Sequence, residues 1–156
     1  MNRRKKWYIA GICGVLGLIL ISAGLLAAGW YSLSGPEGAY FDSAGARIHY
    51  IDEGRGTPVV LVHGFMNPAY LQWGRTGRIE ALAKDYRVIA LDNRGHGRSG
   101  KPHGPGQYGV QMAEDVVRLL DHLRIDKAHV VGYSMGGFIT LKLAVLHPER
   151  LLSAAV

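Results

Sequence analysis

The sequence predicts an α/β protein with a mostly parallel β-sheet, preceded by one long apolar helix. Short apolar runs alternate with amphipathic stretches along residues 39–156, and residues 7–31 carry no charged side chain. Glycine-containing segments follow several of the apolar runs at their carboxyl ends. Continuous apolar runs are typical of strands that are buried on both faces, and alternating strands and helices form parallel sheets with helices on both faces.

The apolar segment at residues 7–31 follows a basic N-terminus at residues 1–6. At about 1.5 Å per residue, a helix of this length reaches across the roughly 30 Å hydrocarbon core of a bilayer. Trp7 and Trp30 lie near its ends, where aromatic side chains favour membrane interfaces. We therefore expect a single-pass transmembrane anchor with a cytoplasmic N-terminus and the remaining chain outside. A cleaved signal peptide, which would release a secreted protein, is the alternative.

Residues 32–38 are expected to form a short linker, because Gly and Pro interrupt any helix there. The domain that follows, residues 39–156, begins with two expected strands around a Ser-Ala-Gly turn within residues 39–54. Apolar runs predict the later strands, and apolar spacing of three and four residues predicts the helices. The later strands are expected at residues 57–64, 86–95, 127–134 and 150–156, and the helices at residues 107–124 and 135–147.

The composition excludes several classes of function. The formal net charge is +6, from 18 basic and 12 acidic residues, but the basic run at residues 3–6 carries much of it. The rest of the chain is nearly neutral, and no basic stripe predicts nucleic-acid binding. Cys13 is the only cysteine in the sequence, so no intrachain disulfide can form. No spacing of His, Asp and Glu predicts a metal site, and nothing implies a cofactor.

The stretch "VVGYSMGGF", residues 130–138, places Ser134 in a G-x-S-x-G pattern between a predicted strand and a predicted helix. This pattern forms a strained turn that exposes the serine hydroxyl. Gly132 and Gly136 remove side chains that would collide two positions away from the serine. The backbone N–H of Met135, at the helix N-terminus, would point at a developing oxyanion. A tight turn that merely contains a serine is the alternative, and the flanking elements argue against it.

Two glycine-containing segments that precede the Ser134 turn in the sequence follow predicted strands in the same way. His63-Gly64-Phe65 follows one predicted strand, and Asp92-Asn93-Arg94-Gly95-His96-Gly97-Arg98-Ser99 follows the next. With Gly132-Tyr133-Ser134-Met135-Gly136-Gly137, they occur in the order and at the spacing of the α/β-hydrolase fold family. Residues 39–156 resemble the first half of that family's fold.

The resemblance implies that Ser134 is the nucleophile and that Phe65 and Met135 donate backbone hydrogen bonds to the oxyanion. The G-x-S-x-G turn around Ser134 is called the nucleophile elbow in this family. The resemblance also implies that a group of residues supports the elbow and its neighbouring loops: His63, Gly64, Gly132, Gly136, Gly137 and Asp92. A serine at the elbow, rather than an aspartate, points to esterases, lipases, C–C hydrolases and acyltransferases, and away from dehalogenases and epoxide hydrolases.

The same resemblance requires an acid and a histidine downstream of the nucleophile. Only His147 and Glu149 follow Ser134, and His147 should lie roughly 20 Å away along the predicted helix, at about 1.5 Å per residue. We therefore expect the chain to be the N-terminal portion of a longer enzyme, without the acid and histidine of the triad. By itself it should be inactive.

The remaining histidines offer no obvious base. In the family reading, His63 orients the oxyanion loop. His129 lies in a predicted strand, where we expect its polar atoms to be hydrogen-bonded within the fold. His96 lies in a glycine-rich loop that could approach the site, and we expect a structural role for it. His49 and His122 have no evident chemical partner in the sequence.

The expected function of the whole protein is hydrolysis of an ester or related acyl substrate through an acyl-enzyme. Its expected partners are a small-molecule acyl substrate and, through residues 7–31, a lipid bilayer, and the oligomeric state is left open. A non-catalytic membrane-tethered interaction module and an acyltransferase are the alternatives.

Overall fold

A computed structural model describes residues 15–25 and 35–156 of the chain. The chain divides into two compact units, Met1–Gly35 and Pro36–Val156. Residues 15–25 are helical. Within the two described stretches, no helix combines the length and the apolar character needed to cross a membrane. Most of the expected anchor, residues 7–31, lies outside the described residues, so the anchor stays a prediction.

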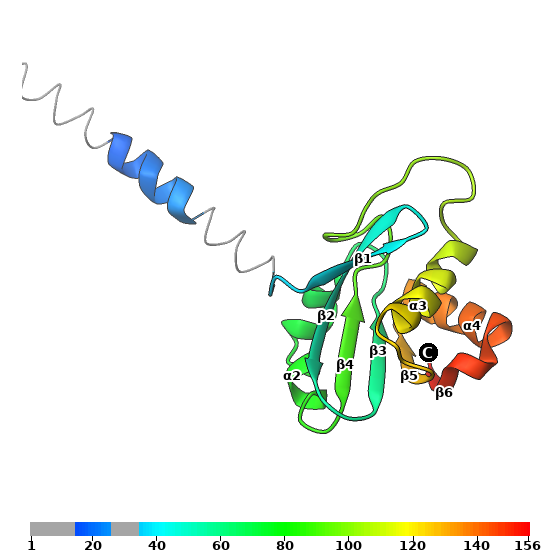
Figure 1. Cartoon of the computed structure of the whole chain (residues 1–156). Helices are drawn as coiled ribbons and strands as arrows, with labels where there is room; N and C mark the ends of the chain where they lie inside the picture. Colours follow the sequence, from blue (N-terminus) through cyan, green and yellow to red (C-terminus); the bar gives the residue numbers. More distant parts are fainter. Residues whose placement is uncertain (1–14, 26–34) are drawn as a thin grey trace, which may run out of the picture. The chain divides into compact units, whose positions relative to one another are not determined.

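The second unit is built on a mixed β-sheet (Figure 1). Its described strands lie in the order β1-β2-β4-β3-β5-β6. They are β1 (Ala39–Ser43), β2 (Ala46–Gly54), β3 (Pro58–Val62), β4 (Arg87–Leu91), β5 (Ala128–Gly132) and β6 (Leu151–Ala155). The first two strands pair antiparallel with their neighbours, whereas β3, β4, β5 and β6 run parallel to one another. The mostly parallel sheet is therefore confirmed, with an antiparallel hairpin at its start.

Helices connect the parallel strands. They are η1 (Tyr70–Gly74) and α2 (Arg78–Leu82) before β4, α3 (Val110–His122) before β5, and α4 (Met135–Leu146) with η2 (Pro148–Arg150) before β6. Both expected helices are present, each shorter than predicted. η1 and α2 are not predicted by the sequence, because each is a single turn or little more and shows too little apolar period to detect.

The helices cover both faces of the sheet, as the apolar strands predict. Val60 and Val62 of β3 pack with α3 and α4, in a cluster that includes Leu119. Val59 and Leu61 of the same strand pack on the other face, against η1 and α2. Successive strand residues point to opposite faces, so a continuous apolar run fills both layers of core.

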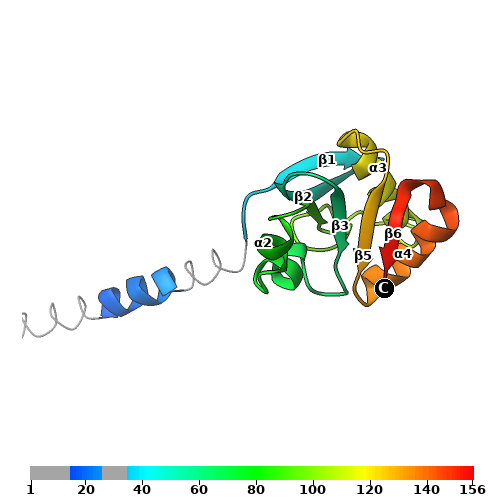
Figure 2. The same cartoon turned by 90° about the horizontal axis from the view of Figure 1, so that it is seen from below.

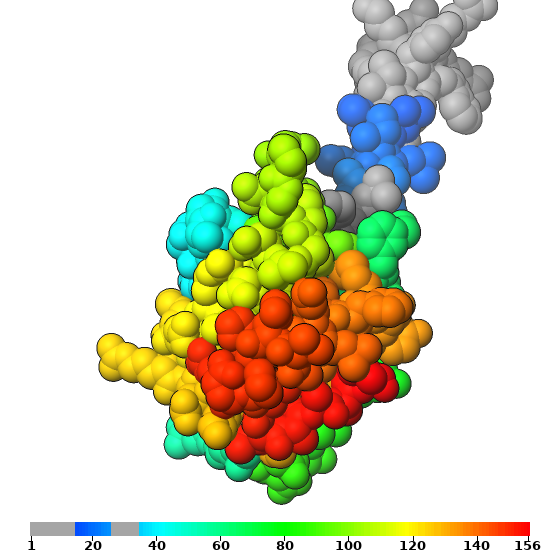
Figure 3. All heavy atoms as spheres, turned by 90° about the vertical axis from the view of Figure 1, so that its right-hand side faces the viewer, coloured from blue at the N-terminus to red at the C-terminus, as the bar shows by residue number. Residues whose placement is uncertain are grey.

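β6 forms an edge of the described sheet, beside β5 and α4 (Figure 2). α4 and β6 form much of the surface on this side of the unit (Figure 3). Apolar side chains are exposed here: Phe138, Leu141 and Val145 on α4, Leu152 on β6, and Val156 directly after β6.

Candidate active site

Ser134 lies on the turn between β5 and α4, and its side chain is exposed. Its backbone has φ 54° and ψ −114°, a conformation that residues with a side chain rarely adopt. Such strain costs on the order of 1–3 kcal/mol and persists only where the surrounding structure enforces it. A tight turn that merely contains a serine gives no reason for this strain. A nucleophile whose hydroxyl must be exposed to the substrate does give a reason.

Close backbone packing enforces the turn. A Cβ atom at Gly132 would lie 2.5 Å from Thr140 Oγ1 and would also collide with the carbonyl of Gly136. A Cβ atom at Gly136 would collide with the carbonyl of Val62, at the end of β3. Both glycines of the G-x-S-x-G pattern are therefore required by contact, and α4 starts directly against the end of β3.

The loop after β3 lies against the elbow. A Cβ atom at Gly64 would be 3.2 Å from the carbonyl oxygen of Tyr133 and 3.4 Å from Ser134 Cβ. Among the described residues, the backbone N–H groups of Phe65 and Met135 have no hydrogen-bond partner. Two free donors on adjoining segments beside the serine are the arrangement that an oxyanion hole needs.

His63 holds this loop in place. Its Nε2 accepts a hydrogen bond of 2.9 Å from the Asn93 N–H, and its Nδ1 lies 2.7 Å from the carbonyl oxygen of Gly64. The Asn93 side-chain amide donates in turn to the His63 carbonyl oxygen at 3.0 Å. Burial lowers the pKa of His63, which agrees with a neutral ring that donates from Nδ1 and accepts at Nε2. Both ring nitrogens are occupied, so His63 orients the loop and is not free to act as a base.

Asp92, at the carboxyl end of β4, is the centre of a second set of contacts. Its carboxylate accepts hydrogen bonds from the Ala69 N–H at 2.7 Å, the Arg98 N–H at 2.9 Å and His49 Nδ1 at 2.9 Å. Burial by itself raises the pKa of Asp92, but the bonds from His49, Arg98 and Ala69 outweigh it and lower the pKa. Asp92 thus ties η1, β2 and its own loop together, in agreement with a supporting role.

The expectation that His49 and His122 lack chemical partners is wrong. His49 is buried and bonds to Asp92, and its backbone N–H donates to Ser99 Oγ at 2.8 Å. His122 lies 3.3 Å from the Tyr50 hydroxyl. These partners lie 43 and 72 residues away in the chain, so only tertiary structure reveals them.

No described histidine forms a hydrogen bond with Ser134. His147 pairs with Glu114 at 2.9 Å, and the bond to Glu114 raises the His147 pKa, in line with a cation at the end of α4. His129 bonds to Ser153 at 2.7 Å, across the β5–β6 pairing. In residues 15–25 and 35–156, no group of His, Cys, Asp and Glu could hold a metal ion.

A cleft of about 640 Å³ opens beside the elbow. We call it the elbow cleft, and the residues that line it are Phe65, Met66, Gly95, His96, Gly97, Tyr108, Met112 and Met135. It brings together the two candidate oxyanion donors and the glycine-rich loop after β4. The sequence does not single out Tyr108 or Met112 as cleft residues, because Tyr108 lies in the loop before α3 and Met112 fits the buried face of that helix.

This fold and this elbow define a class of protein. Residues 57–156 match the family described as alpha/beta hydrolase fold. The chain belongs to that family, as its sequence motifs indicate.

Individual relatives are similar over most of this chain. It is 46% identical over 101 residues to the dihydrolipoyllysine-residue acetyltransferase component of the acetoin cleaving system of Pseudomonas putida, covering 65% of this chain and 26% of that protein. It is 38% identical over 117 residues to a putative carbamate hydrolase, RutD, of Azorhizobium caulinodans, covering 75% and 43%. A crystallised meta-cleavage product hydrolase from Pseudomonas fluorescens IP01 superposes with a TM-score of 0.68 at 36% identity, covering 75% and 43%. The chain therefore spans less than half the length of these relatives.

Proposed function

We propose that the protein is a serine hydrolase that cleaves an ester or related acyl substrate through an acyl-enzyme, with Ser134 as nucleophile. Hydrolases among the relatives support the reaction type. The single observation that carries the proposal is the strained, exposed Ser134, held by backbone contact beside the unpartnered N–H groups of Phe65 and Met135. These are the nucleophile and the anion donors of acyl transfer.

In this mechanism Ser134 Oγ attacks the substrate carbonyl carbon while a general base takes the hydroxyl proton. The carbonyl oxygen becomes an oxyanion that accepts hydrogen bonds from the N–H groups of Phe65 and Met135. Collapse of the tetrahedral intermediate breaks the bond to the leaving group, which receives the proton from the base. Water then attacks the carbonyl carbon of the acyl-enzyme while the base takes a proton from it. The bond to Ser134 Oγ breaks, the base returns the proton to Oγ, and the acid is released.

The proposal requires a histidine and an acid from residues beyond these 156. A serine hydroxyl is a weak nucleophile at its ordinary pKa and needs an adjacent base. None of the described histidines bonds to Ser134, and those with other partners are held elsewhere. Residues 35–156 alone should therefore show no turnover at ordinary enzyme rates.

Fluorophosphonate labelling of the full-length protein tests the nucleophile. Ser134→Ala should abolish covalent labelling and lower kcat by about 10⁴-fold or more, as for other triad knockouts. Ser153→Ala is the matched control, because Ser153 is exposed and bonds to His129 at 2.7 Å but lies within strand β6 and not on a G-x-S-x-G turn. Labelling that survives Ser134→Ala and disappears in Ser153→Ala would overturn the assignment.

An acyltransferase is the second candidate, favoured by the similarity to the Pseudomonas putida acetyltransferase component. The acyl-enzyme would be the same, but an alcohol or thiol would replace water in the second step. Product analysis with an added alcohol separates the two: hydrolysis gives the free acid, whereas transfer gives the new ester.

We also propose that residues 7–31 anchor the protein in a membrane, with residues 1–6 cytoplasmic. The support is in the sequence, namely the uncharged segment behind a basic N-terminus. A reporter active only outside the cytoplasm, fused after Gly38, should be active, and a reporter active only in the cytoplasm should be silent. The reverse pattern contradicts the orientation, and a mature protein that begins near Trp30 indicates cleavage.

A further inference from the structure

The elbow cleft has only two polar side chains in its lining, His96 and Tyr108. Its lining contains no Asp, Glu, Lys or Arg, and it includes Phe65, Met66, Met112 and Met135. Methionine sulfur and aromatic edges pack well against aromatic ligands. His96 contributes the one imidazole of the lining.

The His96 ring is held in one orientation. Its Nδ1 lies 3.2 Å from the carbonyl oxygen of Arg94. The ring meets His63 and Phe65 edge to face, with centroid distances of 5.3 and 5.5 Å. A carbonyl oxygen only accepts hydrogen bonds, so Nδ1 is the donor, and Nε2 is the ring nitrogen left to accept a hydrogen bond. No described residue forms a hydrogen bond with that nitrogen.

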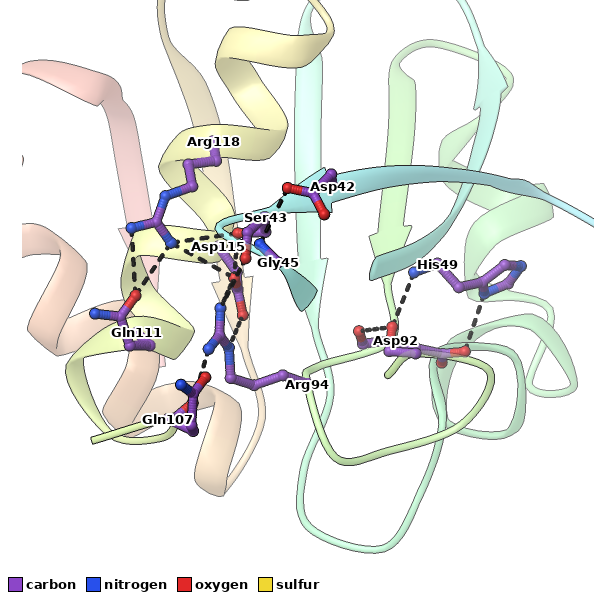
Figure 4. A network of polar contacts seen from close by, with 11 residues as sticks. Asp42, Ser43, Gly45, His49, Asp92, Arg94, Gln107, Gln111, Asp115 and Arg118 are labelled. Atoms are coloured by element: carbon purple, nitrogen blue, oxygen red, sulfur yellow. Dashed lines mark hydrogen bonds and ion pairs between the residues drawn. The ribbon is translucent and has the colours of Figure 1, made fainter. Parts of the chain in front are cut away.

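The residue that bonds His96 is itself fixed by a buried ion pair. The Arg94 guanidinium donates to both carboxylate oxygens of Asp115, at 2.6 and 2.5 Å, and to the Gln107 carbonyl oxygen at 2.7 Å (Figure 4). Both charged side chains are 1% exposed. This clamp joins the loop after β4 to α3, so the wall that presents His96 is preorganised, which is the condition for a selective polar contact.

From this arrangement we propose that His96 is a substrate-positioning residue whose Nε2 accepts a hydrogen bond from a hydroxyl or N–H group of an otherwise apolar, aromatic acyl substrate. This inference rests on the proposed function, because it assigns the substrate class of the same cleft. It adds one acceptor to the lining that also holds the two donors of Phe65 and Met135. A substrate would thus be recognised at two points, its carbonyl oxygen by the donors and its own donor group by His96.

The expected preference is moderate. A neutral hydrogen bond in a protein corresponds to roughly a three- to tenfold change in affinity. Phenol and anisole form a suitable probe pair, because they share the ring and the oxygen, and only phenol can donate. We compare the ratio of the anisole Kd to the phenol Kd in two proteins. This ratio should be three- to tenfold larger for the protein with His96 than for the His96→Phe variant.

Nitrogen-15 NMR of the histidine-labelled, intact Ser134→Ala protein tests the contact directly. The free protein should show a protonated Nδ1 and a bare Nε2 at His96. Phenol should shift the Nε2 resonance, and anisole should leave it unchanged. The opposite tautomer, or equal shifts from the two probes, would overturn the proposal.

Two variants separate the acceptor from the shape of the ring. His96→Phe keeps an aromatic ring against Phe65 but removes the acceptor, so the phenol preference should vanish. His96→Gln restores an acceptor, so part of the preference should return. A preference that persists in His96→Phe would also overturn the proposal. Because binding is measured without turnover, failure here leaves the labelling result at Ser134 intact, and failure of labelling leaves the binding result interpretable.

Discussion

His49 Nδ1 lies 2.9 Å from Asp92 Oδ2, inside a region where both side chains are 3–4% exposed. The other ring nitrogen, Nε2, lies 2.9 Å from the carbonyl oxygen of Glu37. Both partners are acceptors, so the two hydrogen bonds together require protons on both nitrogens. Through these two contacts the His49 ring fastens the start of the domain to the loop after β4.

The first prediction follows from this pair. His49→Phe should lower the free energy of unfolding by about 3–5 kcal/mol, because it leaves the Asp92 carboxylate buried without its His49 partner. His122→Gln is the control and should cost less than about 1 kcal/mol, since its bond to Tyr50 is long at 3.3 Å and its side chain is exposed. Urea unfolding measures both, and nitrogen-15 NMR should show two protonated nitrogens at His49. A bare nitrogen there contradicts the assignment.

The second prediction concerns acid. Although burial raises it, the pKa of Asp92 lies below its ordinary 3.8 through the bonds from His49, Arg98 and Ala69. A depressed carboxyl pKa contributes stability that is fully present above the unfolded value and is lost as the pH falls through the folded value. The free energy of unfolding should therefore drop below about pH 3.8 less steeply in Asp92→Asn than in the wild type. Equal slopes in Asp92→Asn and in the wild type would refute the prediction.

The third prediction concerns the elbow glycines. Gly136→Ala forces a Cβ atom into the carbonyl of Val62, whereas a Cβ atom at Gly137 would meet only ordinary contacts, the nearest at 3.6 Å from Val156. We expect Gly136→Ala to destabilise the protein by about 1–3 kcal/mol, as overpacking does, and to abolish fluorophosphonate labelling. Gly137→Ala should fold and label normally. Thermal unfolding and labelling, run side by side, decide it, and normal labelling of Gly136→Ala would show that the turn tolerates a side chain.

The fourth prediction compares two Arg–Asp pairs of different burial. Asp115→Asn leaves the buried Arg94 without its counter-charge and should cost about 3–5 kcal/mol. Asp52→Asn breaks the pair with Arg87, which is 31% exposed, and should cost about 0–1 kcal/mol. Both pairs are two-pronged and similar in length, and they differ in burial and in the further contacts of Asp115 with Ser43 and Arg118. Similar costs for the two variants would contradict it.

The sequence by itself determined much of this protein, because local patterns carry the information. Apolar runs predicted the parallel strands, and the G-x-S-x-G pattern predicted the turn at Ser134, where the observed φ of 54° agrees. These features depend on residues within a few positions of one another, and steric and apolar periodicity act over that range. The short helices η1 and α2 escaped prediction because they contain too few residues to show a period.

Only the tertiary structure decided the partners of buried polar groups. His49 and Asp92 are 43 residues apart, and Ser43 and Asp115 are 72 apart, yet each pair shares a hydrogen bond (Figure 4). The protons on the His49, His63 and His96 rings follow from whether the neighbour is a donor or an acceptor, and the chain brings those neighbours together only after the sheet has formed. A buried polar atom must find a partner wherever the fold supplies one, so its identity is a property of the packed molecule and not of any local sequence.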